Sequence, residues 1–408
     1  MAENNDYDEN LKLLGKLKKA FNEQWQQVVS DSSSWLSLNT VVTKVVSKTE
    51  EAISELKEAN TILTEINKEN DKLSKSDLSK IVNNSFDIAS KYNKTAADYL
   101  SAVKEASSAG YENIEDIAEL SIAAQVAGDM TSELANQYII AADKAYQMGG
   151  SVQKLKEVLD GSNNITNHHT VNMTELAEGM SIVGEQAASL GVEINETIAV
   201  LGTMITAAQQ SGSEAANAFK AILLNIRQIA DEEEGIDAEG LAKYQQACNA
   251  LGVSLKETKN GITSLREPMD VIKDLSEEYS KLDANDIRRT NLLNSVGGNV
   301  NADALNAILE NYDMYSEMLE EYASGTGSMA AEAEITANSW EGSLNRLSNT
   351  WTDTVGNIAD SDAVITIINV LNELLSVVNN VTDALGSFGT IGLGAGIMGI
   401  TKFVKNFA

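Results

Sequence analysis

Proline occurs only once in this chain of 408 residues, at Pro268. An average chain of this length contains about 20 prolines, at roughly 5% of its residues. Aromatic residues are also scarce, at 5%, although β-rich domains depend on aromatic and β-branched side chains. Cys248 is the single cysteine, so no internal disulfide can form. The sequence therefore argues against a β-sandwich, a β-barrel, a proline-rich linker and a disulfide scaffold. It predicts a long, mostly helical chain.

The net charge of −30 is spread unevenly. Residues 1–110 hold 14 basic and 17 acidic side chains, whereas the remaining residues hold 16 basic and 43 acidic ones. A chain this acidic repels phosphate backbones, so tight nucleic-acid binding is not expected. The simplest interpretation of the charge is that it keeps the protein in solution. The first ten residues hold four acidic side chains and no apolar run, so no N-terminal signal peptide is expected.

Residues 40–73 show a heptad pattern of apolar side chains. The a positions are Val42, Thr49, Leu56, Leu63 and Asn70, and the d positions are Val45, Ala52, Ala59, Ile66 and Leu73. Eight of these ten residues are apolar, which predicts a coiled coil or a long bundle helix, with Asn70 setting the register. An ordinary amphipathic helix within one domain fits the pattern equally well.

From about Ala109 the sequence becomes rich in alanine, and single glycines interrupt it. Leu-Gly-Val occurs at 190–192 and again at 251–253, an offset of 61 residues. This pattern predicts a helix stop, in which glycine takes the left-handed position after the helix and valine packs back on the helix end. Two occurrences are too few to predict a solenoid.

Three further helices are expected. The first covers 213–230 and opens with a serine cap and an early glutamate. The second starts at Pro268, where a first-turn proline is tolerated, and ends near Leu282. The third covers 302–322. Between the first two, the acidic segment 231–239 lacks the spacing of a calcium loop and is expected to be a solvated connection.

The C-terminal part changes character again. Residues 364–378 are rich in Ile, Val and Leu and predict a buried helix. From Ala384 to Thr401 the chain has 18 consecutive uncharged residues, six of them glycine. This length is at the lower limit for a membrane-spanning helix, but the glycines weaken the helix. We expect a segment that partners bury, or that inserts into a membrane on demand.

The two histidines, His168 and His169, are adjacent, which does not suit a metal site. Asn163, Asn164 and Asn167 predict a surface loop around them. With 60 acidic residues in the chain, no carboxylate pair can be singled out as catalytic. No catalytic, cofactor or metal-binding residue is therefore predicted.

Three other features also have structural interpretations. Gly394 to Gly399 matches the GxGxxG dinucleotide fingerprint, but too few residues follow for the βαβ unit that it requires. Cys248 lies in an alanine-rich helical run and is expected to be a small core residue. Trp340 and Trp351 are about three helical turns apart, so they share a face that packs in the core or on a partner helix.

Several segments occur in a fixed order between Ala109 and Leu393. They are AGYENI at 109–114; AASLGV at 187–192, SGSEAA at 211–216 and FKAIL at 219–223; LGV at 251–253, LREPMDVI at 265–272 and Leu275; NAILENY at 306–312; and SWEGSLNRL at 339–347, continuing to Trp351. Their order and spacing resemble the phage tail tape measure family, in the TP901 type common in phages of Gram-positive bacteria. No single segment is specific by itself.

The resemblance implies a structural virion protein without enzymatic activity or a cofactor. Such proteins are long and helical, and a few self-associated copies lie in the lumen of the tail tube. Their length sets the tail length, and they leave with DNA ejection. The implied partners are tail tube protein, tail assembly chaperones and distal tail-tip proteins, first in the host cytoplasm and then in the virion. The segment from Ala384 to Thr401 would contact the host membrane transiently.

The fold expected is all-α, with long coiled-coil-like N-terminal helices, an alanine-rich helical bundle core and an apolar, glycine-rich C-terminal segment. The expected divisions are 1–108 for the N-terminal region, 109–300 for the core, 301–383 for long helices with Trp340 and Trp351, and 384–408 for the apolar segment. A tail-associated peptidoglycan hydrolase and a helical scaffold unrelated to phages remain alternative functions.

The net charge yields a first prediction. The purified protein is expected not to bind duplex DNA at physiological salt, because its negative charge opposes the phosphate backbone. Fluorescence anisotropy with a labelled duplex measures this directly. Tight binding would contradict our interpretation of the acidity.

Overall fold

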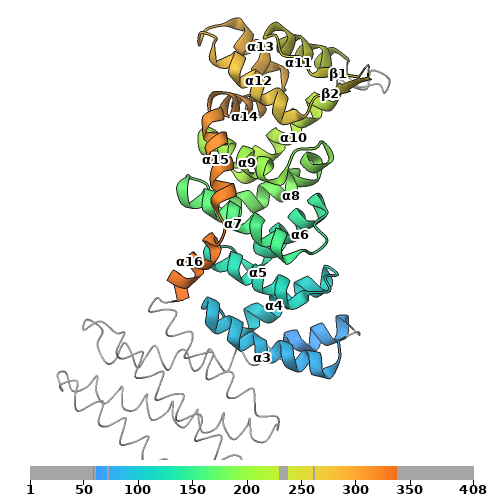
Figure 1. Ribbon diagram of the computed structural model, residues 1–408, viewed down its shortest axis with the longest axis vertical. Helices are drawn as coiled ribbons and strands as arrows, with labels where there is room; N and C mark the ends of the chain where they lie inside the picture. Colours follow the sequence, from blue (N-terminus) through green and yellow to red (C-terminus); the bar gives the residue numbers. More distant parts are fainter. Residues whose placement is uncertain (1–57, 59–60, 71–72, 229–237, 261, 338–408) are drawn as a thin grey trace, which may run out of the picture. The chain divides into compact units, whose positions relative to one another are not determined.

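The computed structural model describes residues 58, 61–70, 73–228, 238–260 and 262–337. This part of the chain is all-α, as predicted, apart from one short hairpin (Figure 1). The labelled helices are α3 (Lys75–Tyr92), α4 (Ala96–Ser108), α5 (Ile114–Ala127), α6 (Ser132–Tyr146), α7 (Val152–His168), α8 (Met173–Ser189), α9 (Ile194–Ala208), α10 (Gly212–Gln228), α11 (Ala238–Ala250), α12 (Pro268–Ser280), α13 (Ile287–Ser295), α14 (Asn299–Glu310), α15 (Tyr312–Ser324) and α16 (Ser328–Ala337).

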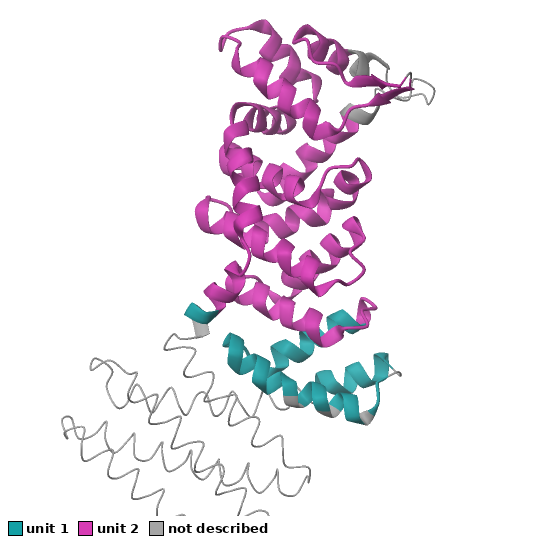
Figure 2. Ribbon diagram, viewed as in Figure 1, with its two compact units in different colours: residues 1–107, 334–408 teal, residues 108–333 magenta. Residues whose placement is uncertain are grey.

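The chain divides into two compact units, one of residues 1–107 and 334–408 and the other of residues 108–333 (Figure 2). In the first unit, a helical segment at 61–69 contacts α4, where Lys104 Nζ lies 2.6 Å from Glu65 Oε2. Asn70 donates a side-chain hydrogen bond to Ser107 Oγ at 2.9 Å. Most of the heptad stretch 40–73 lies outside the described residues, so the coiled coil stays a prediction.

The second unit is a stack of helices in two layers. Helices α6, α8 and α10 pack on one another in one layer, and α5, α7 and α9 follow one another in the other. Each helix also contacts the next one along the chain. Helix starts recur every 18–21 residues, at Asn113, Thr131, Ser151, Asn172, Glu193 and Ser211. The structural repeat is therefore a helix pair of about 40 residues, which the 61-residue offset in the sequence did not indicate.

The predicted helix stops at Gly191 and Gly252 are confirmed. Both glycines have a positive φ, +83° and +80°. After α8, the Val192 amide donates to the Ala187 carbonyl at 3.1 Å, and after α11 the Val253 amide donates to the Cys248 carbonyl at 3.0 Å. Both valines are buried, which completes the Schellman motif at each helix end.

The chain leaves the two glycine stops in different ways. After Gly191 it enters helix α9, whereas after Gly252 it forms a hairpin of β1 (Lys256–Lys259) and β2 (Ile262–Leu265). Lys256 pairs with Leu265, and Lys259 pairs with Ile262. This hairpin was not predicted from the sequence. Its strands are short and mostly exposed, so the sequence contains no long apolar pattern that would predict them.

Two predicted helix starts can be compared with the structure. Helix α12 begins at Pro268 in the first turn, as predicted. Helix α10 begins at Gly212, one residue before the predicted start, because Ser211 rather than Ser213 caps it. Ser211 and Glu214 form a reciprocal capping box, since the Glu214 amide donates to Ser211 Oγ and the Ser211 amide donates to Glu214 Oε2.

The single helix predicted over 302–322 is wrong, because the chain breaks at Asn311 into α14 and α15. Ser276 of α12 donates to the carbonyl of Leu309 at 2.7 Å and so satisfies an acceptor near the end of α14. Packing against α12 thus overrides the local preference for one continuous helix.

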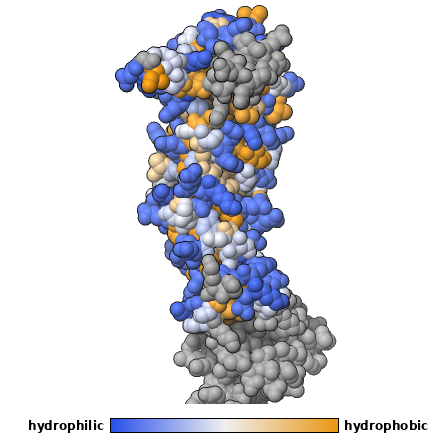
Figure 3. Space-filling model, turned by 90° about the vertical axis from the view of Figure 1, so that its right-hand side faces the viewer, coloured by the Kyte–Doolittle hydropathy of each residue, from blue (hydrophilic) through white to orange (hydrophobic). Residues whose placement is uncertain are grey.

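We call residues 299–333, which comprise α14, α15 and the first part of α16, the arm. In Figure 1 the arm is orange, and α15 crosses the stacked helices α9 and α7. Helix α14 contacts α9, α10 and α12. Hydrophilic residues cover much of the face shown in Figure 3, with hydrophobic residues scattered among them.

Several predictions fall outside the described residues. They concern most of the acidic segment 231–239, Trp340, Trp351, the predicted helix 364–378 and the segment from Ala384 to Thr401. The expected divisions 1–108, 109–300, 301–383 and 384–408 also stay predictions.

The helix stops give a second prediction. Replacing Gly191 with Ala places a Cβ in the left-handed region, where an L-residue costs roughly 1–2 kcal/mol. We expect Gly191→Ala to lower the free energy of unfolding by about 1 kcal/mol, measured by urea denaturation. Gly191→Asn is the matched control and is expected to cost less, since Asn tolerates this conformation better. An equal cost for both variants would contradict the assignment, because nothing crowds a Cβ at Gly191.

Candidate functional site

The histidines do not lie in a surface loop, so that prediction is wrong. Asn163, Asn164 and Asn167 are part of α7, which ends at His168, and His169 caps its C-terminus. The asparagines remain helical because their side chains find partners on the arm, which offsets their weak helix preference. The site that the structure assembles here was missed from the sequence. Its signal is a polar helical face at i, i+3, i+4 and i+7, formed by Asp160, Asn163, Asn164 and Asn167.

Asp160 is the central residue of this site and is only 2% exposed. Its Oδ2 accepts a hydrogen bond from the Gly327 amide at 2.9 Å, and its Oδ1 accepts one from the Met329 amide at 3.2 Å. The Met329 amide lies in the first turn of α16, and Gly327 is the capping position directly before that helix. Gly327 offers no side chain that could cap the helix itself. A residue of α7 therefore supplies the N-cap of a helix more than 160 residues away. The carboxylate also suits the positive end of the α16 dipole.

The asparagines extend this contact along α7. Asn163 donates from Nδ2 to Glu332 Oε2 at 2.9 Å, and its Oδ1 accepts from Ser328 Oγ at 2.5 Å. Asn164 donates to the backbone carbonyl of Glu321 at 2.8 Å. Hydrogen bonds to charged groups contribute roughly 1.5–3 kcal/mol each, and leaving such groups buried without partners costs a similar amount. We call the contacts of Asp160, Asn163 and Asn164 with the arm the latch.

Both histidines lie beside the latch. Nε2 of His169 is 2.7 Å from Glu321 Oε2, and both side chains are largely buried, with 11% and 17% of their surface exposed. His168 is more exposed, and its Nδ1 donates a hydrogen bond to the Asn164 carbonyl oxygen at 2.8 Å. Among the described residues, no group of three or more His, Cys, Asp or Glu side chains could hold a metal ion. The arrangement holds α7 against α15 and the start of α16.

Two glycines let the arm lie close to the stack. A Cβ at Gly161 of α7 would lie 2.5 Å from the ring of Tyr322, and one at Gly202 of α9 would lie 2.8 Å from the sulfur of Met318. Gly161 and Gly202 are 41 residues apart, which is one structural repeat, and Met318 and Tyr322 are one helical turn apart. Two successive turns of α15 thus each rest on a glycine, one from α7 and one from α9.

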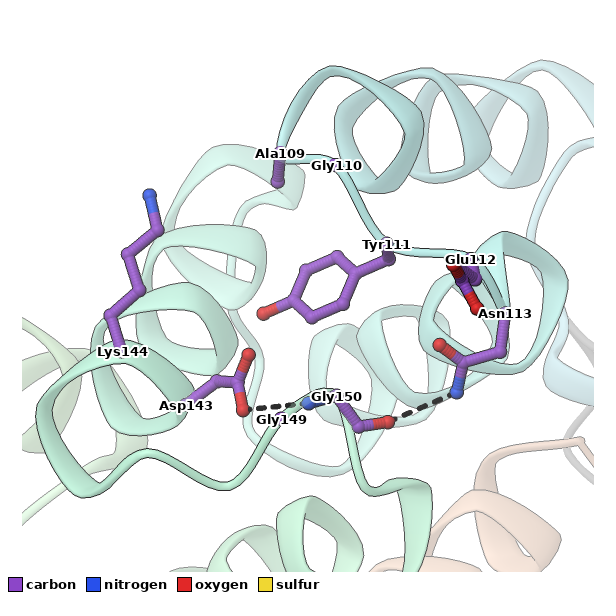
Figure 4. A pocket seen from close by; sticks show the side chains of 9 residues that line it. All are labelled: Ala109, Gly110, Tyr111, Glu112, Asn113, Asp143, Lys144, Gly149 and Gly150. Atoms are coloured by element: carbon purple, nitrogen blue, oxygen red, sulfur yellow. Dashed lines mark hydrogen bonds between the residues drawn. The ribbon is translucent and has the colours of Figure 1, made fainter. Parts of the chain in front are cut away.

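A separate open cavity of about 410 Å³ lies between the α4–α5 and α6–α7 loops (Figure 4). Tyr111 projects between the loops with its hydroxyl directed towards Asp143. Asp143 Oδ1 accepts from the Gly150 amide at 2.9 Å, and Asn113 donates to the Gly150 carbonyl at 3.0 Å. Burial, and then the neighbouring Asp143, raise the pKa of Tyr111. The Asn113 bond joins the α4–α5 loop to the α6–α7 loop, whereas the Asp143 bond joins the end of α6 to the loop that follows it.

Acidic side chains of α9 and α12 lie near Tyr312 of α15. Burial, and then the negative charges of Glu196, Asp270 and Glu277, raise the pKa of Tyr312 to about 12. The pKa of Glu196 is raised as well, mainly by burial and then by neighbouring carboxylates. This local excess of negative charge agrees with the acidity of the sequence.

A family comparison now gives these observations a context. Residues 83–298 match the family model described as phage-related minor tail protein, and the match covers more than half of the chain. The chain belongs to this family. It is thus a phage tail protein, and its expected virion location is consistent with that membership. The matched range includes the two-layer stack and the latch residues of α7, but it ends before the arm.

Two further findings concern the chain as a whole and its described helices. No solved structure matches the chain. None of the described helices is long and apolar enough to cross a membrane. The segment from Ala384 to Thr401 lies outside the residues to which this finding applies.

The position of Cys248 gives a third prediction. Its side chain is fully buried in α11, as expected, and burial raises the pKa of its thiol to about 12. The thiolate is the reactive form, so native protein at pH 8 should react with Ellman's reagent very slowly. Addition of denaturant should release one reactive thiol per chain. Rapid stoichiometric labelling of the native protein would contradict the burial.

Proposed function

We propose that this tail protein is a tape measure, a structural scaffold that sets tail length during assembly of the tail tube and is released at DNA ejection. The observation that carries the proposal is the ordered set of segments between Ala109 and Leu393, which resembles the tape measure family. Membership of the minor tail protein family supports a structural tail role. In this role the protein acts without catalysis and without a cofactor.

The physical properties of the chain suit a ruler. A helix advances ~1.5 Å per residue, so 408 residues in one continuous helix would span roughly 600 Å. A proline inside a helix costs about 3 kcal/mol and kinks it. The chain has a single proline, and in the stacked form Pro268 avoids this cost because it lies in the first turn of α12. The stacked helices are then the compact form that precedes extension within the tube.

The proposal includes partners and locations. The tail tube protein would polymerise around a few self-associated copies of the chain, with tail assembly chaperones and distal tail-tip proteins at the ends. Assembly would take place in the host cytoplasm, and the finished protein would lie in the tail lumen. The apolar segment from Ala384 to Thr401 would contact the host membrane at ejection. The net charge of −30 would keep the chain from holding the DNA that later passes through the tube.

Tail length provides the fourth prediction. Removing roughly 28 residues, or about four heptads, from within 40–73 preserves the heptad register and shortens an extended helix by ~42 Å. Tails of the parent phage carrying this deletion are expected to be shorter by about that length in electron micrographs. Duplication of the same heptads is the matched control and should lengthen the tails equally. Unchanged tails in both variants would refute a measuring role for this region.

A further inference from the structure

The arm differs from the rest of the second unit in how it is connected. Helices α5 to α10 each contact their neighbours along the chain and within their layer. Helices α15 and α16 of the arm instead reach α9 and α7 through bonds that join residues more than 100 positions apart, whereas α14 packs on α9, α10 and α12. The stack keeps its own sequential contacts when the arm is removed, because such repeats are stabilised by nearest neighbours.

Two consecutive glycines lie directly before the arm. Gly297 and Gly298 precede α14, both have φ of +76°, and nothing lies within 4 Å of a Cβ placed on either residue. At the far end, α16 depends on the stack for its start, since its N-cap acceptor is Asp160 of α7. Gly327 at the capping position cannot replace it with a side chain of its own.

We propose that the arm is a separately opening part of this unit, that the latch at Asp160 holds it closed, and that α16 is folded only while the arm is docked. Opening would leave the α16 amides without their acceptor, so undocking and unwinding of α16 would occur together. It would also uncover Gly161 and Gly202, on which Tyr322 and Met318 rest. The proposal concerns the free protein and does not depend on the tape measure role.

Hydrogen exchange measured by mass spectrometry on the full chain tests the proposal. In the wild type, amides of α15 and α16 are expected to exchange faster than those of α6 and α8. In Asp160→Ala, exchange in α15 and α16 should accelerate about tenfold or more, because two hydrogen bonds to a buried carboxylate are lost. Exchange in α6 and α8 should change by less than about twofold, since these helices pack on one another and on α10.

Asp143→Ala is the matched control. It removes another largely buried carboxylate that accepts a backbone amide, but this bond lies within the α6–α7 loop and not on the arm. It should accelerate exchange near Gly150 and leave α15 and α16 unchanged.

Gly161→Ala provides a second, independent disruption. Alanine is preferred over glycine at an interior helix position, so the added methyl group does not weaken α7 itself. It collides with the Tyr322 ring, and Asp160 remains in place. We expect faster exchange in α15 and α16 without faster exchange in α7 away from the arm.

The results that would overturn the proposal are distinct. If α15, α16, α6 and α8 exchange at one common rate in the wild type, the unit opens as a whole. If Asp160→Ala accelerates all helices equally, the latch is part of a single cooperative core. If neither Asp160→Ala nor Gly161→Ala affects α15 and α16, the latch does not hold the arm. None of these results bears on tail length, so failure here is separable from failure of the proposed function.

Discussion

Every helix leaves backbone amides at its start and carbonyls at its end without helical partners, and the whole structure depends on how these groups are satisfied. A chain built from short helices has many such ends. Ser74 and Asn172 supply capping boxes within their own segments, and Gly191 and Gly252 close Schellman motifs. Each solution is local and encoded within a few residues. The stack follows from these stops, because they cut the chain into helices of similar length that pack as a repeating pair.

The exceptions to local capping occur where distant parts of the chain meet. Asp160 caps α16, and Ser276 binds the carbonyl of Leu309 near the end of α14. In both places a side chain of one helix supplies what the other helix lacks. The arm is therefore shaped by the helices on which it lies as much as by its own sequence. This dependence links its helical structure to its docking.

The predictability of the fold follows the same division. The helix stops, the proline at the start of α12 and the buried Cys248 were predictable, because each rests on a few neighbouring residues. The single helix over 302–322 was a reasonable local prediction, and tertiary contact with Ser276 accompanies its break. The loop predicted around Asn163 and Asn164 failed for a related reason, since their partners lie on the arm, far along the chain. The same applies to the latch as a whole, whose polar spacing was visible but whose partner was not.

The placement of the two histidines has a practical consequence. The chain contains only these two, and both lie at the C-terminal end of α7 beside Glu321. Imidazole protons resonate in a region of the NMR spectrum that few other side chains occupy. In a protein of 408 residues, two signals would thus report on a single contact without isotope labelling. The two histidines therefore provide a spectroscopic probe of the contact between α7 and α15.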